Sequence, residues 1–187
     1  MDTINWGILS TANIGVDLVI PAMQQSGYGR VKAISSRNKE KAEAVASKLD
    51  IEKVHGSYED LLADDDIDAI YNPLPNHLHL EWTLKAMEAG KHVLCEKPIG
   101  MDAAEAKKLM EAAKKYPELK VMEAFMYRFH PQWDMVKKWI SDGVLGTVKT
   151  VHSVFTYYND DPENIRNKSG IGGGGLMDIG CYCISAS

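Results

Sequence analysis

The chain has 187 residues, of which 45% are apolar and 25% are charged, the balance of a soluble globular protein. Its net charge of −5 does not suit a non-specific nucleic-acid binder, and no apolar run approaches the roughly 20 residues of a membrane-spanning helix. Three cysteines imply no disulfide framework and residues 1–5 carry no signal-peptide features, so we expect a cytoplasmic protein that binds neither nucleic acid nor membrane.

Short apolar runs alternate with amphipathic stretches over most of the chain. Ala42, Val45, Ala46 and Leu49 share one helical face, for example, and Pro21 is expected to bend the helix that contains it. This alternation over short connections predicts an α/β protein with a doubly wound parallel sheet. Strands are expected at residues 5–9, 31–35, 53–55, 67–71, 92–95 and 120–123, and helices at residues 13–25, 38–49, 58–63, 77–89 and 102–115.

The pattern changes after residue 123. We expect a helix at residues 131–141, one long strand at 147–158, a polar loop at 159–169 and the beginning of a further helix at 176–187. A single strand and an unfinished helix cannot bury their own apolar faces. We therefore expect a first domain at residues 1–123 and the incomplete start of a second domain at residues 124–187.

The first expected strand runs into a turn, Ser10-Thr-Ala-Asn-Ile-Gly15, that opens a helix. Dinucleotide-binding folds have a G-x-G-x-x-G motif at this place, and here only its last glycine is present. The small side chains of Ser10 and Ala12 still allow a pyrophosphate to approach the helix N-terminus. Because the motif is weak by itself, a tight turn without a ligand is the alternative interpretation.

The second expected strand ends without the acidic residue that NAD enzymes use to bind the ribose 2′-hydroxyl. Ser36 and Arg37 stand there instead. A hydroxyl and a guanidinium suit a 2′-phosphate, and the plane of an arginine can stack on adenine. The alternative is that residues 36–38 simply cap the following helix and that Arg37 is solvated.

Polar residues also follow the fourth and fifth expected strands. Residues 72–77 read Asn-Pro-Leu-Pro-Asn-His, and Glu96, Lys97 and Pro98 follow the fifth strand. Open α/β sheets bind ligands at this edge, where a lysine can hold a hydroxyl or lower the pKa of a neighbouring acid.

Two pairs of potential metal ligands are spaced by two residues, His77 with His79 and Cys181 with Cys183. No recognised zinc-binding spacing is present, so we interpret the histidines as loop and helix-cap residues and expect no metal.

Near the end of the chain, Asp178 and Tyr182 follow a run of glycines. If Asp178 opens a helix, Tyr182 lies four residues later on the same face, and a carboxylate beside a phenol could handle a proton. The alternative is an N-cap aspartate and a buried aromatic residue.

Taken together, these segments resemble the glucose-fructose oxidoreductase, inositol dehydrogenase and MocA-type family of NAD(P)-dependent oxidoreductases. The most specific parts are Cys-Glu-Lys-Pro at residues 95–98, Glu-Ala-Phe-Met-Tyr-Arg-Phe-His-Pro at 123–131 and the glycine-rich segment at 173–180. The family usually has a histidine where this chain has Tyr182. That difference, like Ser36 and Arg37, is similar to the branch with dimeric dihydrodiol dehydrogenase and NADP-dependent D-xylose dehydrogenase, in which a tyrosine is the acid–base group.

The resemblance implies NADP-dependent hydride transfer between nicotinamide and a hydroxyl-bearing carbon of a sugar or cyclic diol. The catalytic residues would be Tyr182 for the hydroxyl proton, Lys97 to stabilise its phenolate, and Asp178 to orient the substrate. The cofactor-binding residues would be Ser10, Thr11, Ala12, Asn13, Ile14, Ser36, Arg37, Asn72, Pro73, Leu74, Asn76, His77, Glu96, Lys97 and Arg128.

The resemblance also implies a second domain built on an open α+β sheet, which supplies much of the substrate pocket and the contact of a homodimer or higher homo-oligomer. The chain would hold only the start of that domain, as a fragment or a truncated relative. The Lys97–Pro98 bond is expected to be cis. A non-catalytic NAD(P)-sensing regulatory module is the alternative, because a fold does not determine a function.

Overall fold

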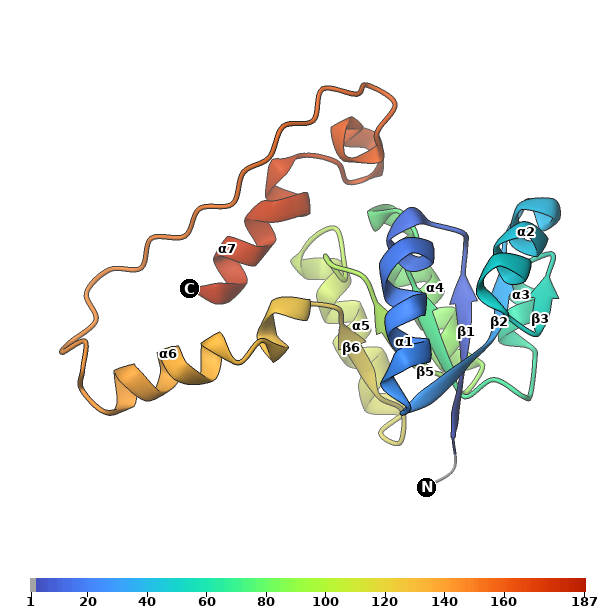
Figure 1. Cartoon of the computed structure of the whole chain (residues 1–187), viewed down its shortest axis with the longest axis horizontal. Helices are drawn as coiled ribbons and strands as arrows, with labels where there is room; N and C mark the ends of the chain where they lie inside the picture. The colour runs from blue at the N-terminus through green and yellow to red at the C-terminus, as the bar shows by residue number, and fades with distance from the viewer. Residues whose placement is uncertain (1–2) are drawn as a thin grey trace. The chain divides into compact units, whose positions relative to one another are not determined.

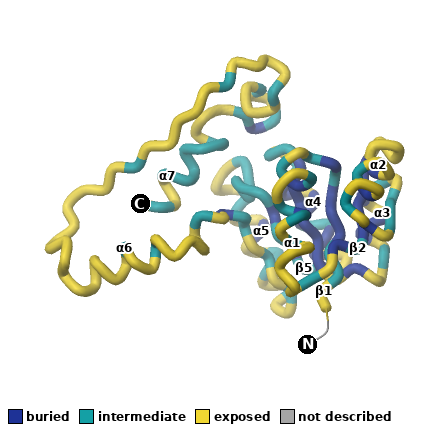
Figure 2. The backbone as a smooth tube through the Cα atoms, viewed as in Figure 1, coloured by how far each residue is buried: buried dark blue, intermediate teal, exposed yellow. Residues whose placement is uncertain are grey.

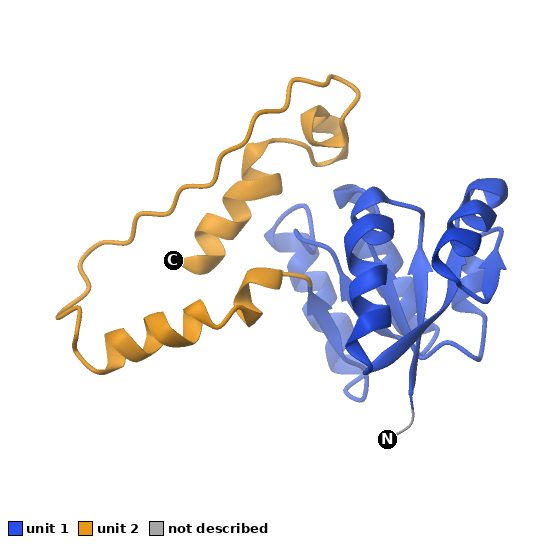
Figure 3. Ribbon diagram, viewed as in Figure 1, with its two compact units in different colours: residues 1–123 blue, residues 124–187 orange. Residues whose placement is uncertain are grey.

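The computed structural model describes residues 3–187. Met1 and Asp2, which belong to the opening segment examined for a signal peptide, lie outside the described residues. The chain divides into two compact units, Met1–Glu123 (unit 1) and Ala124–Ser187 (unit 2), shown in Figure 3. Over residues 3–187, no helix has both the length and the hydropathy that crossing a membrane requires.

A parallel sheet of six strands forms the centre of unit 1 (Figure 1). Its strand order, β3-β2-β1-β4-β5-β6, is that of doubly wound dinucleotide-binding folds, so the predicted fold class is confirmed. The order reverses between β1 and β4, and this architecture binds ligands in the crevice outside the carboxyl ends of those strands. The strands are β1 (Ile4–Leu9), β2 (Gly29–Ser35), β3 (Lys53–His55), β4 (Ala69–Asn72), β5 (His92–Cys95) and β6 (Val121–Glu123).

The helices of unit 1 lie where the apolar periodicity predicts them, within a few residues at their ends. In the first, the backbone N–H of Ile20 donates to the carbonyl of Gly15, five residues earlier. Pro21 has no N–H and would crowd the preceding turn of a regular α-helix, and a π-helical turn just before it provides the extra room. The elements are η1 (Gly15–Val19), α1 (Ile20–Ser26), α2 (Lys39–Leu49), α3 (Tyr58–Leu62), η2 (Asn76–Leu78), α4 (His79–Glu88) and α5 (Ala103–Lys115).

The core of unit 1 lies on both faces of the sheet. Successive strand residues point to opposite faces, so the neighbours Ile8 and Leu9 belong to different apolar clusters. The cluster with Ile8 is covered by α1 and α2, which contribute Ile20 and Ala46 among others. The cluster with Leu9 is covered by α3, α4 and α5. The strand ends are therefore held between two packed layers of helices (Figures 1 and 2).

Unit 2 is built from helical segments joined by an extended stretch. Helices are present at both places where they were predicted, but residues 147–158 form no strand, so the prediction of a long strand there is wrong. β-rich composition makes a strand only when a neighbouring strand takes up its backbone hydrogen bonds, and the described part of unit 2 contains no other strand. The elements are η3 (Met126–Phe129), α6 (Gln132–Ser141), η4 (Ile165–Asn167), η5 (Ser169–Ile171), η6 (Leu176–Gly180) and α7 (Cys181–Ala186).

Candidate functional site

The turn after β1 has the geometry of a dinucleotide turn without its first glycine. Ser10 has a φ of 69°, in the left-handed region that glycine occupies most easily. Its hydroxyl accepts a hydrogen bond from the backbone N–H of Ala12 at 3.2 Å, a local bond that supports this conformation. A helix begins at Asn13, so its first N–H groups lie at the carboxyl edge of the sheet. Such N–H groups form an anion-binding arrangement.

The end of β2 presents a hydroxyl and a cation. The Ser36 hydroxyl accepts from the backbone N–H of Asn38 at 3.1 Å, and the exposed Arg37 guanidinium lies beside the Tyr58 hydroxyl. Burial raises the pKa of Tyr58, and the positive charge of Arg37 partly opposes that rise. The cap of α2 is Asn38, whose side chain accepts from the N–H of Lys41 at 2.9 Å. Asn38 therefore caps α2 and Arg37 is exposed, as the alternative interpretation has it, and Arg37 also lies beside Tyr58.

The loop after β4 is held in place by Asn72, which is fully buried. Its side-chain amide donates to the carbonyl of His79 at 3.2 Å and to the Thr83 hydroxyl at 3.3 Å. Its side-chain oxygen accepts from the N–H of Leu74 at 3.3 Å. The Asn72 side chain is thus engaged within unit 1, and its contact with a cofactor stays a prediction.

The turn after β5 is joined to β4 by two hydrogen bonds. The Tyr71 hydroxyl donates to the Glu96 carboxylate at 2.8 Å, and the N–H of Glu96 donates to the carbonyl of Asn72 at 3.0 Å. The Lys97–Pro98 bond is cis, as the family resemblance implies. The predicted residues after β4 and β5 therefore lie together at one edge of the sheet, with Lys97 half-buried among them.

His79 is the clearest residue that the sequence interpretation misjudged. It is 1% exposed and both of its ring nitrogens contact backbone carbonyls, so it is a buried residue at the start of α4 and not a loop histidine. The signal for this was available, because His79 lies three residues before Trp82 and four before Thr83, both on the buried face of α4.

Tyr182 lies in an aromatic cluster within unit 2. Its ring centroid is 5.3 Å from that of Phe125, 5.6 Å from that of Phe155 and 6.0 Å from that of Tyr127. The Tyr127 hydroxyl in turn shares a hydrogen bond of 2.8 Å with the hydroxyl of Ser185, also on α7. The contacts with Phe125 and Tyr127 are edge-to-face and that with Phe155 is tilted, arrangements that aromatic pairs favour.

Asp178 has partners that the sequence did not suggest. One carboxylate oxygen accepts from Nε of Arg166 at 3.0 Å, and the other accepts from the hydroxyl of Tyr157. This hydrogen bond to the carboxylate raises the pKa of Tyr157. Asp178 lies inside the first helical turn after Gly175, so it is not the N-cap of the alternative interpretation. Together with Gly174, these side chains line a pocket of about 140 Å³.

The structure thus groups the predicted residues in two sets. Unit 1 brings together the turn after β1, the tip of β2 and the loops after β4 and β5, whereas Asp178 and Tyr182 belong to unit 2. Within residues 3–187 there is no group of three or more histidine, cysteine, aspartate or glutamate side chains that could hold a metal ion.

Two family models match most of the chain. Residues 4–125 match the GFO/IDH/MocA oxidoreductase family with an NAD-binding Rossmann fold, and residues 133–187 match the GFO/IDH/MocA C-terminal domain.

Named relatives agree with this match. The chain is 45% identical to a D-xylose 1-dehydrogenase (NADP(+)) of Haloferax volcanii over 97% of its own length and 55% of the relative's. It is 38% identical to a trans-1,2-dihydrobenzene-1,2-diol dehydrogenase of Xenopus laevis, covering 96% of this chain and 54% of that one.

A solved 3-ketoreductase of Actinomadura kijaniata, in complex with NADP and TDP-benzene, superimposes on this chain with a TM-score of 0.92 at 37% identity. The match covers 99% of this chain and 56% of the ketoreductase. The chain therefore spans about half the length of the relatives that it matches.

Proposed function

Because the chain belongs to the GFO/IDH/MocA family of oxidoreductases, we propose that it is part of an NADP-dependent dehydrogenase or reductase. The cofactor would bind at the carboxyl edge of unit 1, and the substrate would carry a hydroxyl or carbonyl on a sugar or cyclic diol. The relatives named above include enzymes for both substrate classes. A non-catalytic sensing role has no support among these relatives, which are named as dehydrogenases and reductases.

The observation that carries the choice of NADP is the donor set at the tip of β2. The residues that follow this strand offer a hydroxyl and a guanidinium and no carboxylate. The Ser36 oxygen already accepts from Asn38, so its own proton is available to donate to a phosphate oxygen. Arg37 adds a charged, planar donor that matches phosphate geometry. The backbone N–H groups at Asn13 and Ile14 suit the pyrophosphate in the same way. The residues present therefore fit NADP.

When bound, NADP supplies the hydride acceptor, and the chain's own residues handle the proton and the orientation of the substrate. Tyr182 would take the proton from the substrate hydroxyl in oxidation and return it in reduction. A phenol ordinarily has a pKa of about 10, so it needs a nearby cation to act as a base near neutral pH, and we assign that part to Lys97.

Asp178 would orient the substrate through the glycine-rich segment. Its two oxygen atoms are held by Arg166 and Tyr157, which gives this carboxylate a fixed direction. We further propose Arg128 for the nicotinamide side and a homo-oligomer for the complete protein, both from the family resemblance.

Exchange of one charge tests the choice of cofactor. Arg37→Asp should weaken NADPH binding by about 10-fold or more, because a bidentate cation becomes a repelling carboxylate, and should weaken NADH binding far less. Fluorescence titration of both dinucleotides would measure this. Arg30→Asp is the matched control, because Arg30 lies at the opposite end of β2 in an exposed ion pair with Glu52. Equal affinity of the unmutated chain for NADH and NADPH would contradict the proposal.

A further inference from the structure

A buried histidine stands between two loops of the proposed cofactor site. His79 opens α4 and is 1% exposed. Its Nε2 lies 2.6 Å from the carbonyl oxygen of Leu74, in the loop after β4. Its Nδ1 lies 2.6 Å from the carbonyl oxygen of Pro98, in the turn that carries Lys97. One side chain therefore contacts the backbone of both loops.

The chemistry of these contacts requires ring protons. A carbonyl oxygen only accepts, so each hydrogen bond needs an N–H of the imidazole, and a neutral ring has one such group. Burial lowers the pKa of His79. The two carbonyls and the Glu96 carboxylate oppose this lowering, and the positive charge of Lys97 reinforces it. A neutral ring donates to one of the two carbonyls, and only the protonated ring donates to both.

A histidine at this buried position needs a reason, because an apolar side chain would fill the same space at a lower cost in folding free energy. A buried polar group stabilises a protein only when it is hydrogen-bonded, and a buried carbonyl left without a donor is unfavourable. The backbone of His79 is hydrogen-bonded as well, because its carbonyl oxygen accepts from the side-chain amide of Asn72 at 3.2 Å. His79 thus belongs to a bonded network that connects the ends of β4 and β5.

We propose that His79 is a positioning residue that couples the loop after β4 to the turn carrying Lys97, and thereby fixes the spacing of the two loops toward the cofactor. This inference rests on the proposed function, because it assigns these loops to an NADP site. It predicts that a donor at residue 79 matters more than apolar filling.

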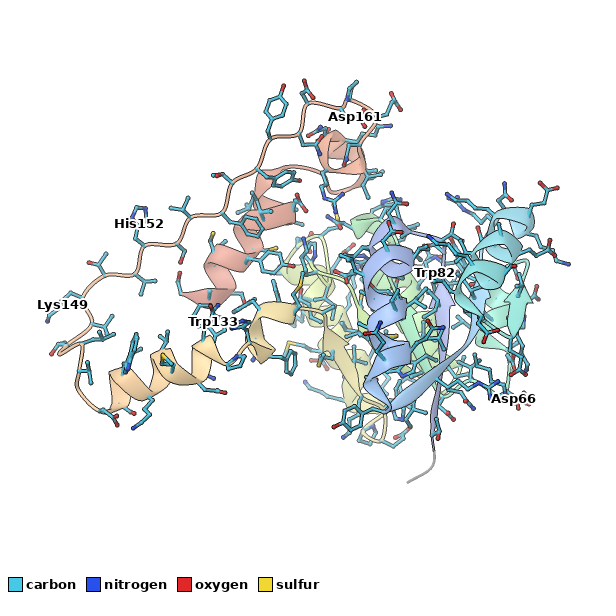
Figure 4. All side chains as sticks on the ribbon, in the orientation of Figure 1. Asp66, Trp82, Trp133, Lys149, His152 and Asp161 are labelled. Carbon is cyan, nitrogen blue, oxygen red and sulfur yellow. The ribbon has the colours of Figure 1, made fainter. Side chains whose placement is uncertain are left out.

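Two replacements separate positioning from packing. His79→Gln keeps a donor, the NH₂ group of its side-chain amide, whereas His79→Leu removes every donor and fills the space with apolar atoms. We expect NADPH affinity to fall by about 10-fold or more in the leucine variant and by only a few-fold in the glutamine variant. A residue that only fills space would give the reverse order, because a buried amide costs more than a buried leucine. His152→Gln is the control, since His152 is exposed on the extended segment and projects away from unit 2 (Figure 4).

Hydrogen exchange without cofactor gives a second measurement. The backbone N–H groups of Leu74 and Glu96 donate to Asn72 at the end of β4, and that of Ile99 donates to the Glu123 carboxylate on β6. In the leucine variant they should exchange at least several-fold faster than in the unmutated chain, while amides of β1 keep their rates.

The outcomes distinguish the two proposals. If the unmutated chain fails to bind NADPH, the proposed function fails, and exchange of the three loop amides still decides whether His79 couples the loops. If NADPH binds but both variants keep its affinity, or if the leucine variant binds it better than the glutamine variant, His79 is not a positioning residue.

Discussion

Units 1 and 2 contain similar apolar residues, but unit 1 buries them and unit 2 leaves most of them exposed. In unit 1, Ile8 and Ile70 are 0% exposed because helices cover both faces of the sheet. In unit 2, Phe129 and Val154 are each 72% exposed. Figure 2 shows the contrast, with buried residues concentrated in unit 1 and exposed ones along the extended segment of unit 2. Apolar composition alone therefore does not bury a side chain. In this chain, burial follows the paired sheet and the helices that cover it.

The aromatic cluster around Tyr182 shows what unit 2 organises without a sheet. Phe125 and Tyr127, at the start of unit 2, and Phe155, in the extended stretch, meet at one ring of α7. Unit 2 thus orders the surroundings of its proposed catalytic residue while leaving most of its apolar residues exposed.

Amide hydrogen exchange should show the largest difference between the units. Amides in the paired strands, such as those of Ile8 and Ile70, should exchange at least about 1,000-fold more slowly than unprotected amides, because they open only with unit 1. Amides of Val151 and Val154, in a segment without ladder bonds, should exchange close to the unprotected rate. Mass spectrometry of the intact chain would measure both. Slow exchange across residues 147–158 would show that this segment is paired and would remove the contrast.

The two units should nevertheless act together in catalysis. Tyr182→Phe and Lys97→Met should each lower turnover by about 100-fold or more, since acid–base help typically contributes 10² to 10⁴. The double variant should lose little more than either single one, because groups that act as a unit are not additive. Steady-state kinetics on the protein with a complete second domain, with NADP and a panel of aldoses and cyclic diols, would measure this.

Tyr158→Phe and Lys115→Met are the matched controls for this pair, because both residues are exposed and neither belongs to the proposed site. They should leave turnover nearly unchanged. If the losses from the two site variants multiply, Lys97 and Tyr182 act independently, and the assignment of a lysine-stabilised phenolate is wrong.

The sheet was predictable because its signals are local. Strands and amphipathic helices alternate along unit 1, and residues 53–55 and 92–95 are strands with the bounds that the pattern indicated. The segment at residues 147–158 has an equally strong β composition and forms no strand. A strand depends on a partner that no local pattern specifies.

The sequence predicts where the candidate site lies better than it predicts the contacts of the individual side chains. The edge of the sheet follows from strand order, which brings the turn after β1 and the ends of β2, β4 and β5 to one side. The contacts of His79 with Leu74 and Pro98, and of Arg166 with Asp178, join residues distant in sequence. Such partners depend on three-dimensional packing, and residue type alone does not reveal them.

The last and smallest effect that we expect concerns acid stability, which should depend on unit 1. Asp64 accepts hydrogen bonds from Lys53 at 2.9 Å and from His55 at 3.1 Å. Burial of Asp64 acts to raise the pKa of its carboxyl, but these bonds and the N–H of Asp66 outweigh burial and lower that pKa from 3.8 to about 2. A carboxyl with a lowered pKa in the folded state stabilises the protein above its unfolded pKa. That contribution is lost as the pH falls from about 4 through about 2.

Asp64→Asn should therefore lower the melting temperature at pH 7 by a few degrees, roughly 2–4 °C for each kcal/mol lost, and the difference from the unmutated chain should shrink below pH 4. Asp65→Asn is the matched control, because Asp65 is the exposed neighbour and its replacement removes the same charge. Thermal melts followed by circular dichroism between pH 2 and 7 would record both variants. A pH-independent difference for Asp64→Asn would mean that its carboxylate stabilises unit 1 by packing, and a similar loss in the Asp65 variant would assign the effect to net charge. Only a loss confined to Asp64→Asn and fading below pH 4 supports the hydrogen-bonded network with Lys53 and His55.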